Sequence, residues 1–331
     1  MLDRVYGCLV GTAIGDAMGM PASFMTPEQI RHTYGRIDGF LKPAEQQKAH
    51  ADLVKGEITD DTEESLIISS VIIEAGKFDE SLFIKKMRQW AIEKSMLGST
   101  VIGPSTRKFL EAIVKGDNYL EVGKYGDTNG AAMRVAPIGL ANHGNVEKAI
   151  EEATTSALPS HGSKPGVAAA CAVAAAIALA AEGNCTVRDV VDAAVYGAKK
   201  GEEAGFDICA PSVSVRIRLA QDLVERHAEK SLDDICYILY QHIGAGMKSY
   251  ESVPLSLGVF YAACGNFEQG VVSVINVGDD ADTNGAIVGG LCGAYSGAVN
   301  IRPDWMDYIS QQNKLDFKQL AKSLWSIGLN R

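Results

Sequence analysis

The sequence is poor in the features that mark several large classes of protein. Only 7% of its 331 residues are aromatic, and its 31 Lys and Arg residues are outnumbered by 41 Asp and Glu residues, which gives a formal net charge of −10. A nucleic-acid binder needs a basic surface to contact phosphates, and anionic membrane lipids attract basic segments. We therefore expect neither nucleic acid nor membrane among its partners.

Cysteine is scarce and shows no pairing pattern. The seven cysteines are odd in number, none belongs to a Cys-x-x-Cys pair, and most stand among Ala, Val and Leu. Such cysteines are typical of small core residues rather than of a disulfide framework. The first residues also lack the pattern of a secretory signal. Both observations predict a cytoplasmic location.

Long apolar runs are missing as well. Residues 167–181 are almost entirely Ala, Val, Ile and Leu, but a membrane-spanning helix needs about 20 apolar residues. Because alanine strongly favours helix, we expect this segment to be a central helix that other helices approach closely.

Sustained alternation of polar and apolar residues, the pattern typical of half-buried strands, does not occur in the sequence. Apolar residues instead recur at three- and four-residue spacing, which predicts amphipathic helices. No linker, low-complexity tract or charge block divides the chain. The sequence therefore predicts one all-α domain over residues 1–331, with helices at 61–75, 81–95, 105–115, 146–157, 187–204, 213–229 and 232–243.

Glycine, by contrast, is abundant, and eight of the 34 glycines form two regular stripes. Each glycine in a helix interior costs about 0.8–1.0 kcal/mol relative to alanine, so four on one face need a compensating close contact with another helix. We expect the two striped helices to pack on each other and to bring the two ends of the chain together. The stripes are Gly7, Gly11, Gly15 and Gly19, and Gly285, Gly289, Gly293 and Gly297.

Two acidic motifs precede predicted helices. Residues 59–62 read Thr-Asp-Asp-Thr, and residues 280–285 read Asp-Ala-Asp-Thr-Asn-Gly. A single Asp or Thr at a helix start is explained by N-capping, worth about 1 kcal/mol. Capping does not explain several carboxylates crowded together, because like charges repel and raise one another's pKa. A bound cation would remove that conflict.

The types of ligand atom indicate which cation would bind. Oxygen ligands favour Mg²⁺, Mn²⁺ or Ca²⁺ over zinc or copper. The second motif also matches the beginning of an EF-hand loop, but Leu291 stands at the twelfth position, where a bidentate Glu is required. Pooled, the two motifs can bridge two Mg²⁺ or Mn²⁺ ions about 3.5–4 Å apart, an arrangement that activates water. The oxygen donors are Thr59, Asp60, Asp61, Asp280, Asp282 and Thr283.

Two further loops are rich in small residues. Residues 126–134 read Gly-Asp-Thr-Asn-Gly-Ala-Ala-Met-Arg, and residues 160–163 read Ser-His-Gly-Ser. We expect both at helix starts, where free backbone N–H groups can hold phosphate or sugar oxygens. Either loop alone is weak evidence, since Asn-Gly is mostly a turn. No P-loop, dinucleotide fingerprint, nucleophile elbow or zinc signature accompanies them.

Taken together, these motifs resemble the ADP-ribosylglycohydrolase family, which includes ADP-ribosyl hydrolases and dinitrogenase-reductase-activating glycohydrolases, over nearly the whole chain. Residues 11–19 resemble the family's opening helix. The two acidic motifs resemble its metal-binding motifs, and the two loops resemble its ligand-binding loops. The resemblance implies an all-α, single-domain orthogonal helical bundle with a dinuclear Mg²⁺ or Mn²⁺ centre.

The resemblance also implies roles for individual residues. The six oxygen donors would hold the two ions, which polarise ribose hydroxyls and deliver water to an anomeric carbon with oxocarbenium character. Asp16 would contact the ligand or support the metal ligands. The ADP-ribose groove would be lined by Gly126, Thr128, Asn129, Gly130 and His161.

The chain departs from the family pattern at the proton-transfer group. Ser23 stands where many members carry a Glu, and Val101 stands where others carry an Asp before an Ile-Gly dipeptide. We assign the catalytic step to Asp127, together with Asp61 at the metal centre. The other acids near the motifs are Glu28, Glu57 and Glu63.

Three functions remain open at this point. The first is Mg²⁺- or Mn²⁺-dependent hydrolysis of the N-glycosidic bond between ADP-ribose and an arginine-type or related acceptor. The second is hydrolysis of a free nucleoside or small ribosylated metabolite, whose base leaves with less acid assistance. The third is a non-catalytic role like that of the family's crystallins, which the complete metal-ligand set disfavours. Residues 20–56 fit either a lid or a static surface excursion.

Overall fold

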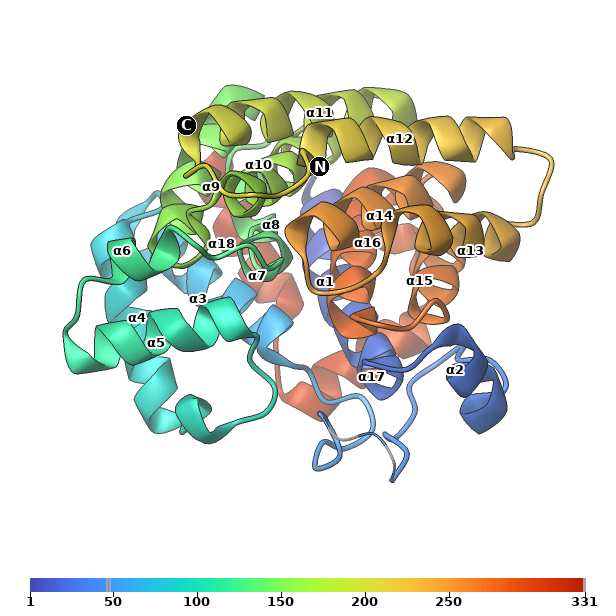
Figure 1. Cartoon of the computed structure of the whole chain (residues 1–331), viewed down its shortest axis with the longest axis horizontal. Coiled ribbons are helices and arrows are strands. Elements are labelled where there is room, and N and C mark those ends of the chain that lie inside the picture. The colour runs from blue at the N-terminus through green and yellow to red at the C-terminus, as the bar shows by residue number, and fades with distance from the viewer. Residues whose placement is uncertain (46, 48, 330–331) are drawn as a thin grey trace.

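The computed structural model describes residues 1–45, 47 and 49–329, which form helices joined by loops (Figure 1). These residues contain no β-strand; two isolated β-bridges join Thr128 to Lys248 and Ser163 to Phe206. The predicted all-α fold is confirmed. The helices are α1 (Leu2–Gly19), α2 (Pro27–Tyr34), α3 (Asp60–Ala75), α4 (Glu80–Glu93), α5 (Pro104–Lys115), α6 (Tyr119–Gly123), α7 (Gly130–Met133), α8 (Ala136–Ala141), α9 (Val146–His161), α10 (Lys164–Glu182), α11 (Val187–Ala204), α12 (Val213–Arg226), α13 (Leu232–Ile243), α14 (Ser249–Ala262), α15 (Phe267–Ile275), α16 (Ala281–Ser296), α17 (Pro303–Asn313) and α18 (Phe317–Gly328).

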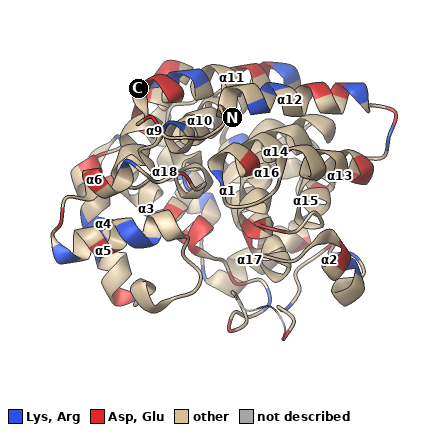
Figure 2. Ribbon diagram, in the orientation of Figure 1, with Lys and Arg blue, Asp and Glu red and all other residues tan. Residues whose placement is uncertain are grey.

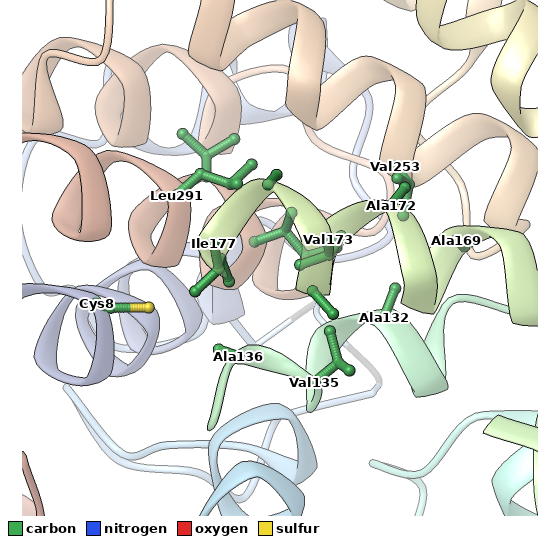
Figure 3. Close-up of a cluster of buried hydrophobic side chains, with 14 of the residues drawn as sticks. Cys8, Ala132, Val135, Ala136, Ala169, Ala172, Val173, Ile177, Val253 and Leu291 are labelled. Atoms are coloured by element: carbon green, nitrogen blue, oxygen red, sulfur yellow. The ribbon is translucent and has the colours of Figure 1, made fainter. Parts of the chain in front are cut away.

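Helix α10 lies in the core, as the alanine-rich run predicts. Ser163 caps its N-terminus by accepting a hydrogen bond from the Gly166 N–H, and the helix ends at Gly183. Small side chains let α7, α8, α9, α11, α14 and α16 approach it closely, and Figure 3 shows its residues among those of α1, α7, α8, α14 and α16. Of the described helices, α10 alone is long and apolar enough to cross a membrane, yet 89% of its apolar window is buried within the protein.

The two glycine-striped helices, α1 and α16, pack directly against each other. A Cβ atom added at Gly7, Gly11, Gly15 or Gly19 would lie within 3.0 Å of the α16 backbone. The expected contact is therefore confirmed, and it places the C-terminal end of α1 beside the start of α16. One detail of the prediction is wrong: Gly297 follows the last helical residue and adopts φ +81°, so it ends α16 rather than extending the stripe.

Helix α9 is longer than the sequence pattern predicts. The predicted end at residue 157 is wrong, because the helix continues through Pro159 to His161. Ser160 and His161 consequently lie in the last turn of a helix and not at a helix start, and Ser163 alone of that motif caps the next helix. Helix α12 ends at Arg226, three residues before the predicted end.

The residues between α2 and α3 that the structure describes (35–45, 47 and 49–59) form no helix. Gln47 fastens this segment: its Nε2 donates to the Met20 carbonyl at 3.1 Å, and its Oε1 accepts from the backbone N–H groups of Ala49 and His50. The Thr100 hydroxyl also donates to the Ala49 carbonyl. These contacts bring His50 from a loop to the start of α16.

Candidate functional site

A cavity of about 170 Å³ lies where the starts of α3, α5, α7 and α16 meet. Figure 2 shows many of the charged residues on the outer helices and a few short acidic segments near the centre of the view. The cavity brings residues of three predicted motifs together. Its polar lining consists of His50, Asp60, Asp61, Thr100, Thr106, Thr128, Asn129, Asp280, Asp282 and Thr283.

Asp16 connects α1 to the start of α3. Its carboxylate accepts hydrogen bonds from the backbone N–H and the hydroxyl of both Thr59 and Thr62, over 2.5–3.2 Å. Thr59 in turn caps α3 by accepting from the Asp61 N–H. Capping is therefore done by the threonine, which leaves both carboxylates of the motif without that role. Burial raises the pKa of Asp16 to about 7, against the lowering effect of the Thr62 hydroxyl.

The carboxylates of the cavity repel one another and raise one another's pKa. Burial, followed by the charges of neighbouring carboxylates, raises the pKa of Asp60, Asp61 and Asp280 well above the usual range. Asp280 stands at the N-cap position of α16 but accepts no capping hydrogen bond there. It accepts one at 2.5 Å from Asn129 Nδ2 instead. The crowding that the sequence predicts is present in the structure.

These residues suit a hard cation. Two buried carboxylate oxygens, Oδ1 of Asp61 and Oδ1 of Asp282, have no hydrogen-bond partner among the described residues, although a buried charged oxygen without a partner is costly. In the described part of the chain, no group of three or more His, Cys, Asp or Glu side chains is placed so that it could hold a metal ion. The oxygen donors thus share one cavity, and their carboxylates repel one another. They do not form a closed coordination shell.

His50 is a site residue that the sequence analysis missed. Its Nε2 lies 2.9 Å from Oδ2 of Asp282, and both side chains are almost fully buried. Burial alone would raise the pKa of Asp282, but the hydrogen bond and charge of His50 hold it below the usual range. The His50 pKa is raised correspondingly, despite the opposing effect of burial. Only a lone histidine ten residues before an acidic motif could have drawn attention to it.

The preferred catalytic acid, Asp127, lies outside the cavity lining. Its Oδ2 pairs with Lys248 Nζ at 2.6 Å, and its backbone carbonyl accepts from Ser249. Gly126 is also outside the lining, because its carbonyl accepts from the Ser163 hydroxyl and its Cα packs against the Ser160 backbone. His161 lies behind Thr128. The roles assigned to these residues stay predictions, and the geometry gives the catalytic role of Asp127 no support.

The other acids considered for proton transfer have structural partners or lie elsewhere. Glu57 accepts from the Val54 N–H, and Glu63 accepts from the Trp90 indole N–H at 2.7 Å. Glu28 lines a separate hollow of about 970 Å³ that adjoins the cavity at Phe24 and Thr100. None of the three lines the acidic cavity.

The two departures from the family pattern lie at the cavity. Val101 lines it. The hydroxyl oxygen of buried Ser23 accepts a hydrogen bond from the Asp282 N–H, with 3.4 Å between the oxygen and the nitrogen. His50 therefore brings an imidazole to a part of the cavity where neither usual carboxylic acid is present.

A buried ion pair joins α3 to Arg134, the residue that follows α7. Arg134 Nη1 donates to Oε2 of Glu64 at 2.6 Å, and both side chains are fully buried. Glu64 was not singled out from the sequence. Its position four residues after Asp60 puts it on the same helical face, and an acid on a buried face needs a partner.

The sequence matches the family model for ADP-ribosylglycohydrolases over residues 1–330. An uncharacterized protein of Escherichia coli (strain K12), YegU, is 32% identical over 97% of this chain and 96% of its own length. The ADP-ribosylarginine hydrolase Tri1 of Serratia proteamaculans is 27% identical over 98% of this chain and 79% of its own.

A solved structure described as an ADP-ribosylglycohydrolase-related protein complex has the same fold. It superposes with a TM-score of 0.70 at 23% identity and covers 99% of this chain and 98% of its own. The all-helical architecture and the family match over residues 1–330 agree. The chain belongs to the ADP-ribosylglycohydrolase family, which is named for the hydrolysis of glycosyl bonds.

Proposed function

We propose that this protein is a Mg²⁺- or Mn²⁺-dependent hydrolase that cleaves the N-glycosidic bond between ADP-ribose and an arginine-type acceptor. The observation that carries the proposal is the cavity in which two acidic motifs, more than 200 residues apart in sequence, present crowded carboxylates with unpartnered oxygens. The acceptor follows from likeness to a relative named as an ADP-ribosylarginine hydrolase.

In this proposal two ions are held by Thr59, Asp60, Asp61, Asp280, Asp282 and Thr283. When bound, such ions supply Lewis-acid polarisation and lower the pKa of water. The protein's own residues fix the ligands: Asp16 holds the start of α3, Asn129 orients Asp280, and His50 orients Asp282. Ionised carboxylates around the cavity also stabilise positive charge developing at an anomeric carbon.

Hydrolysis of a smaller riboside is the second candidate. Two observations favour it: the cavity beside the carboxylates is only about 170 Å³, and no carboxylic acid outside the ligand set lines it. A leaving group that departs without strong acid assistance would suit such a site. A non-catalytic role is disfavoured because every donor of the two motifs is present and buried.

The test is release of free ADP-ribose from ADP-ribosyl-arginine with Mg²⁺ or Mn²⁺, repeated with a chelator. Release that the chelator abolishes supports the proposal. No release from folded, metal-loaded protein, together with hydrolysis of a nucleoside under the same conditions, would replace it with the second candidate. Absence of both activities and of any metal-induced thermal shift would favour the non-catalytic role.

A further inference from the structure

A continuous row of buried polar side chains runs from the interior to the cavity. It begins at Glu64 on α3 and passes through Arg134, Ser160 and His161 to Thr128. Exposed fractions along it range from 0% to 5%. Because bulk water does not reach these groups, each hydrogen bond constrains the next one.

Arg134 determines the direction of the hydrogen bonds along this row, that is, which atom donates and which accepts. A guanidinium has five N–H donors and no acceptor, so it donates to Glu64 and, through Nη2, to the Ser160 hydroxyl oxygen at 2.8 Å. The same nitrogen donates to the Ser156 carbonyl at 3.1 Å. The Ser160 oxygen is therefore an acceptor toward Arg134, and its own proton must be donated elsewhere.

The direction then passes through His161. Among the described residues, the acceptor within reach of the Ser160 hydroxyl is Nδ1 of His161, at 2.8 Å. That nitrogen must carry a lone pair, which leaves the proton of the neutral imidazole on Nε2. Nε2 lies 3.1 Å from the Thr128 hydroxyl oxygen and donates to it. Burial, then the charge of Arg134, holds the pKa of His161 well below its usual value, so the ring is neutral.

Thr128 ends the row at the cavity wall. Its backbone is fixed, since its carbonyl accepts from the Ser249 hydroxyl and it pairs with Lys248. Glycine at position 130 keeps the approach open, because a Cβ atom there would lie 2.8 Å from the His161 ring. Having accepted from His161, the Thr128 hydroxyl keeps its own proton, for which the described residues offer no other acceptor, and this hydroxyl belongs to the cavity lining.

We propose that Arg134, acting through Ser160 and His161, keeps the proton of the Thr128 hydroxyl available to the cavity, where it is donated to an unprotonated ligand oxygen such as that of a phosphate or a ring ether. Arg134, Ser160 and His161 are positioning residues, and Thr128 is the contact. This inference deepens the proposed function, on which it rests for the cavity being the substrate site. It adds a specific requirement: the Thr128 proton is paired only when the ligand presents an acceptor oxygen there.

The direction of the row is tested by ¹⁵N NMR of the His161 imidazole in the ligand-free protein. We expect the neutral Nε2–H form at neutral pH, because the His161 pKa is lowered. In Ser160→Ala, Nδ1 loses its donor, and we expect a mixture with the Nδ1–H form. A wild-type ring in the Nδ1–H form, or a tautomer unchanged in Ser160→Ala, would overturn the inference. This readout does not depend on catalysis, so it stands apart from any failure of the proposed function.

The role of Thr128 is tested by calorimetry with ADP-ribose as the probe. We expect Thr128→Val, which keeps the shape but removes the hydroxyl, to weaken binding about tenfold, and Thr128→Ser to restore it. Thr155→Val, on the same helix as Ser160 but bonded only to its own helix backbone, is the matched control and should bind like the wild type. Wild-type affinity in Thr128→Val contradicts the inference, whereas no binding by the wild type contradicts the proposed function.

Discussion

The two walls of the cavity hold their polar atoms in opposite ways. On the wall formed by the starts of α3 and α16, buried carboxylates raise one another's pKa, and two of their oxygens lack partners. On the wall at Thr128, the hydroxyl and imidazole atoms from Ser160 to Thr128 are paired in sequence. The first wall is electrostatically incomplete by itself, whereas the second is already organised. In the proposals above, a cation would complete the first wall and an acceptor oxygen would bind to the second.

The largest effect is expected from breaking the acidic wall at its ligands. Asp60→Ala and Asp282→Ala should each reduce turnover by about 1,000-fold or more, because the missing carboxylate removes a proposed metal ligand. Both variants should keep a helical circular-dichroism spectrum, since each loses a carboxylate that burial penalises. Asp233→Asn, which removes an acid paired with Arg36 elsewhere, is the control. Unchanged turnover in either ligand variant would exclude the dinuclear mechanism.

A second large effect is expected from separating α1 from α16. In Gly15→Ala the added Cβ would meet the Gly285 backbone well inside van der Waals distance, so we expect about 3 kcal/mol of destabilisation and weaker Mn²⁺ binding. Gly39→Ala is the control, because nothing lies within 4 Å of a Cβ atom there. Equal unfolding midpoints in urea for the two variants would show that the helices separate without cost.

An intermediate effect is expected at His50. His50→Ala should weaken Mn²⁺ binding about 10- to 100-fold, as loss of a group that orients a ligand does, and His50→Gln should recover most of it because the amide can still donate to Asp282. Ser23→Ala tests the weaker 3.4 Å contact to the same residue and should change affinity and turnover little. Calorimetric titration with Mn²⁺ decides; equal affinity in wild type and His50→Ala would remove His50 from the site.

The smallest effect is a difference in pH dependence between the walls. The pKa of Asp16 is raised in the folded protein to about 7, so its stabilising contribution is present at low pH and is lost as pH rises from about 4 through 7. The lowered pKa of His161 acts oppositely, because stability is lost as pH falls below about 6.5.

Several acids with raised pKa oppose one histidine. We therefore expect the unfolding temperature in chelator to fall by about 5 °C between pH 5 and 8. Saturating Mn²⁺ should reverse that slope, because metal binds the ionised carboxylates. Thermal scans with and without the ion make the comparison, and parallel pH profiles would contradict it.

The sequence was most informative where one chemical pattern permits one arrangement. Glycines at positions 11 and 15 weaken a helix unless a neighbouring helix packs closely against them, so the contact between the two stripes could be predicted from the residues alone. The crowding of the acidic motifs could be predicted in the same way, whereas the cation that they would share stays a prediction. The Thr-Asp-Asp-Thr motif also gave the start of α3 to within one residue. These features depend on local geometry and on charge, which are readable without coordinates.

The rest depended on long-range contacts. The spacing of apolar residues predicted that α9 ends at residue 157, but the helix continues to His161 and packs on α10. The presumed anion-binding loop is therefore a row of side-chain contacts. Asp127 looked free in sequence and is paired with Lys248, 121 residues away. His50 reaches the cavity because Gln47 anchors its segment to Met20. No local pattern encodes these three outcomes.

The contact between the glycine stripes also has a consequence for how the protein is made. Gly15 and Gly285 touch through their backbones. During synthesis, α1 therefore cannot pack against α16 until nearly the whole chain has emerged from the ribosome. Most other helices can pack on near neighbours during synthesis, and this closure comes last. The two acidic motifs therefore meet only after α16 has been made, and a product truncated before α16 lacks one side of the acidic cavity.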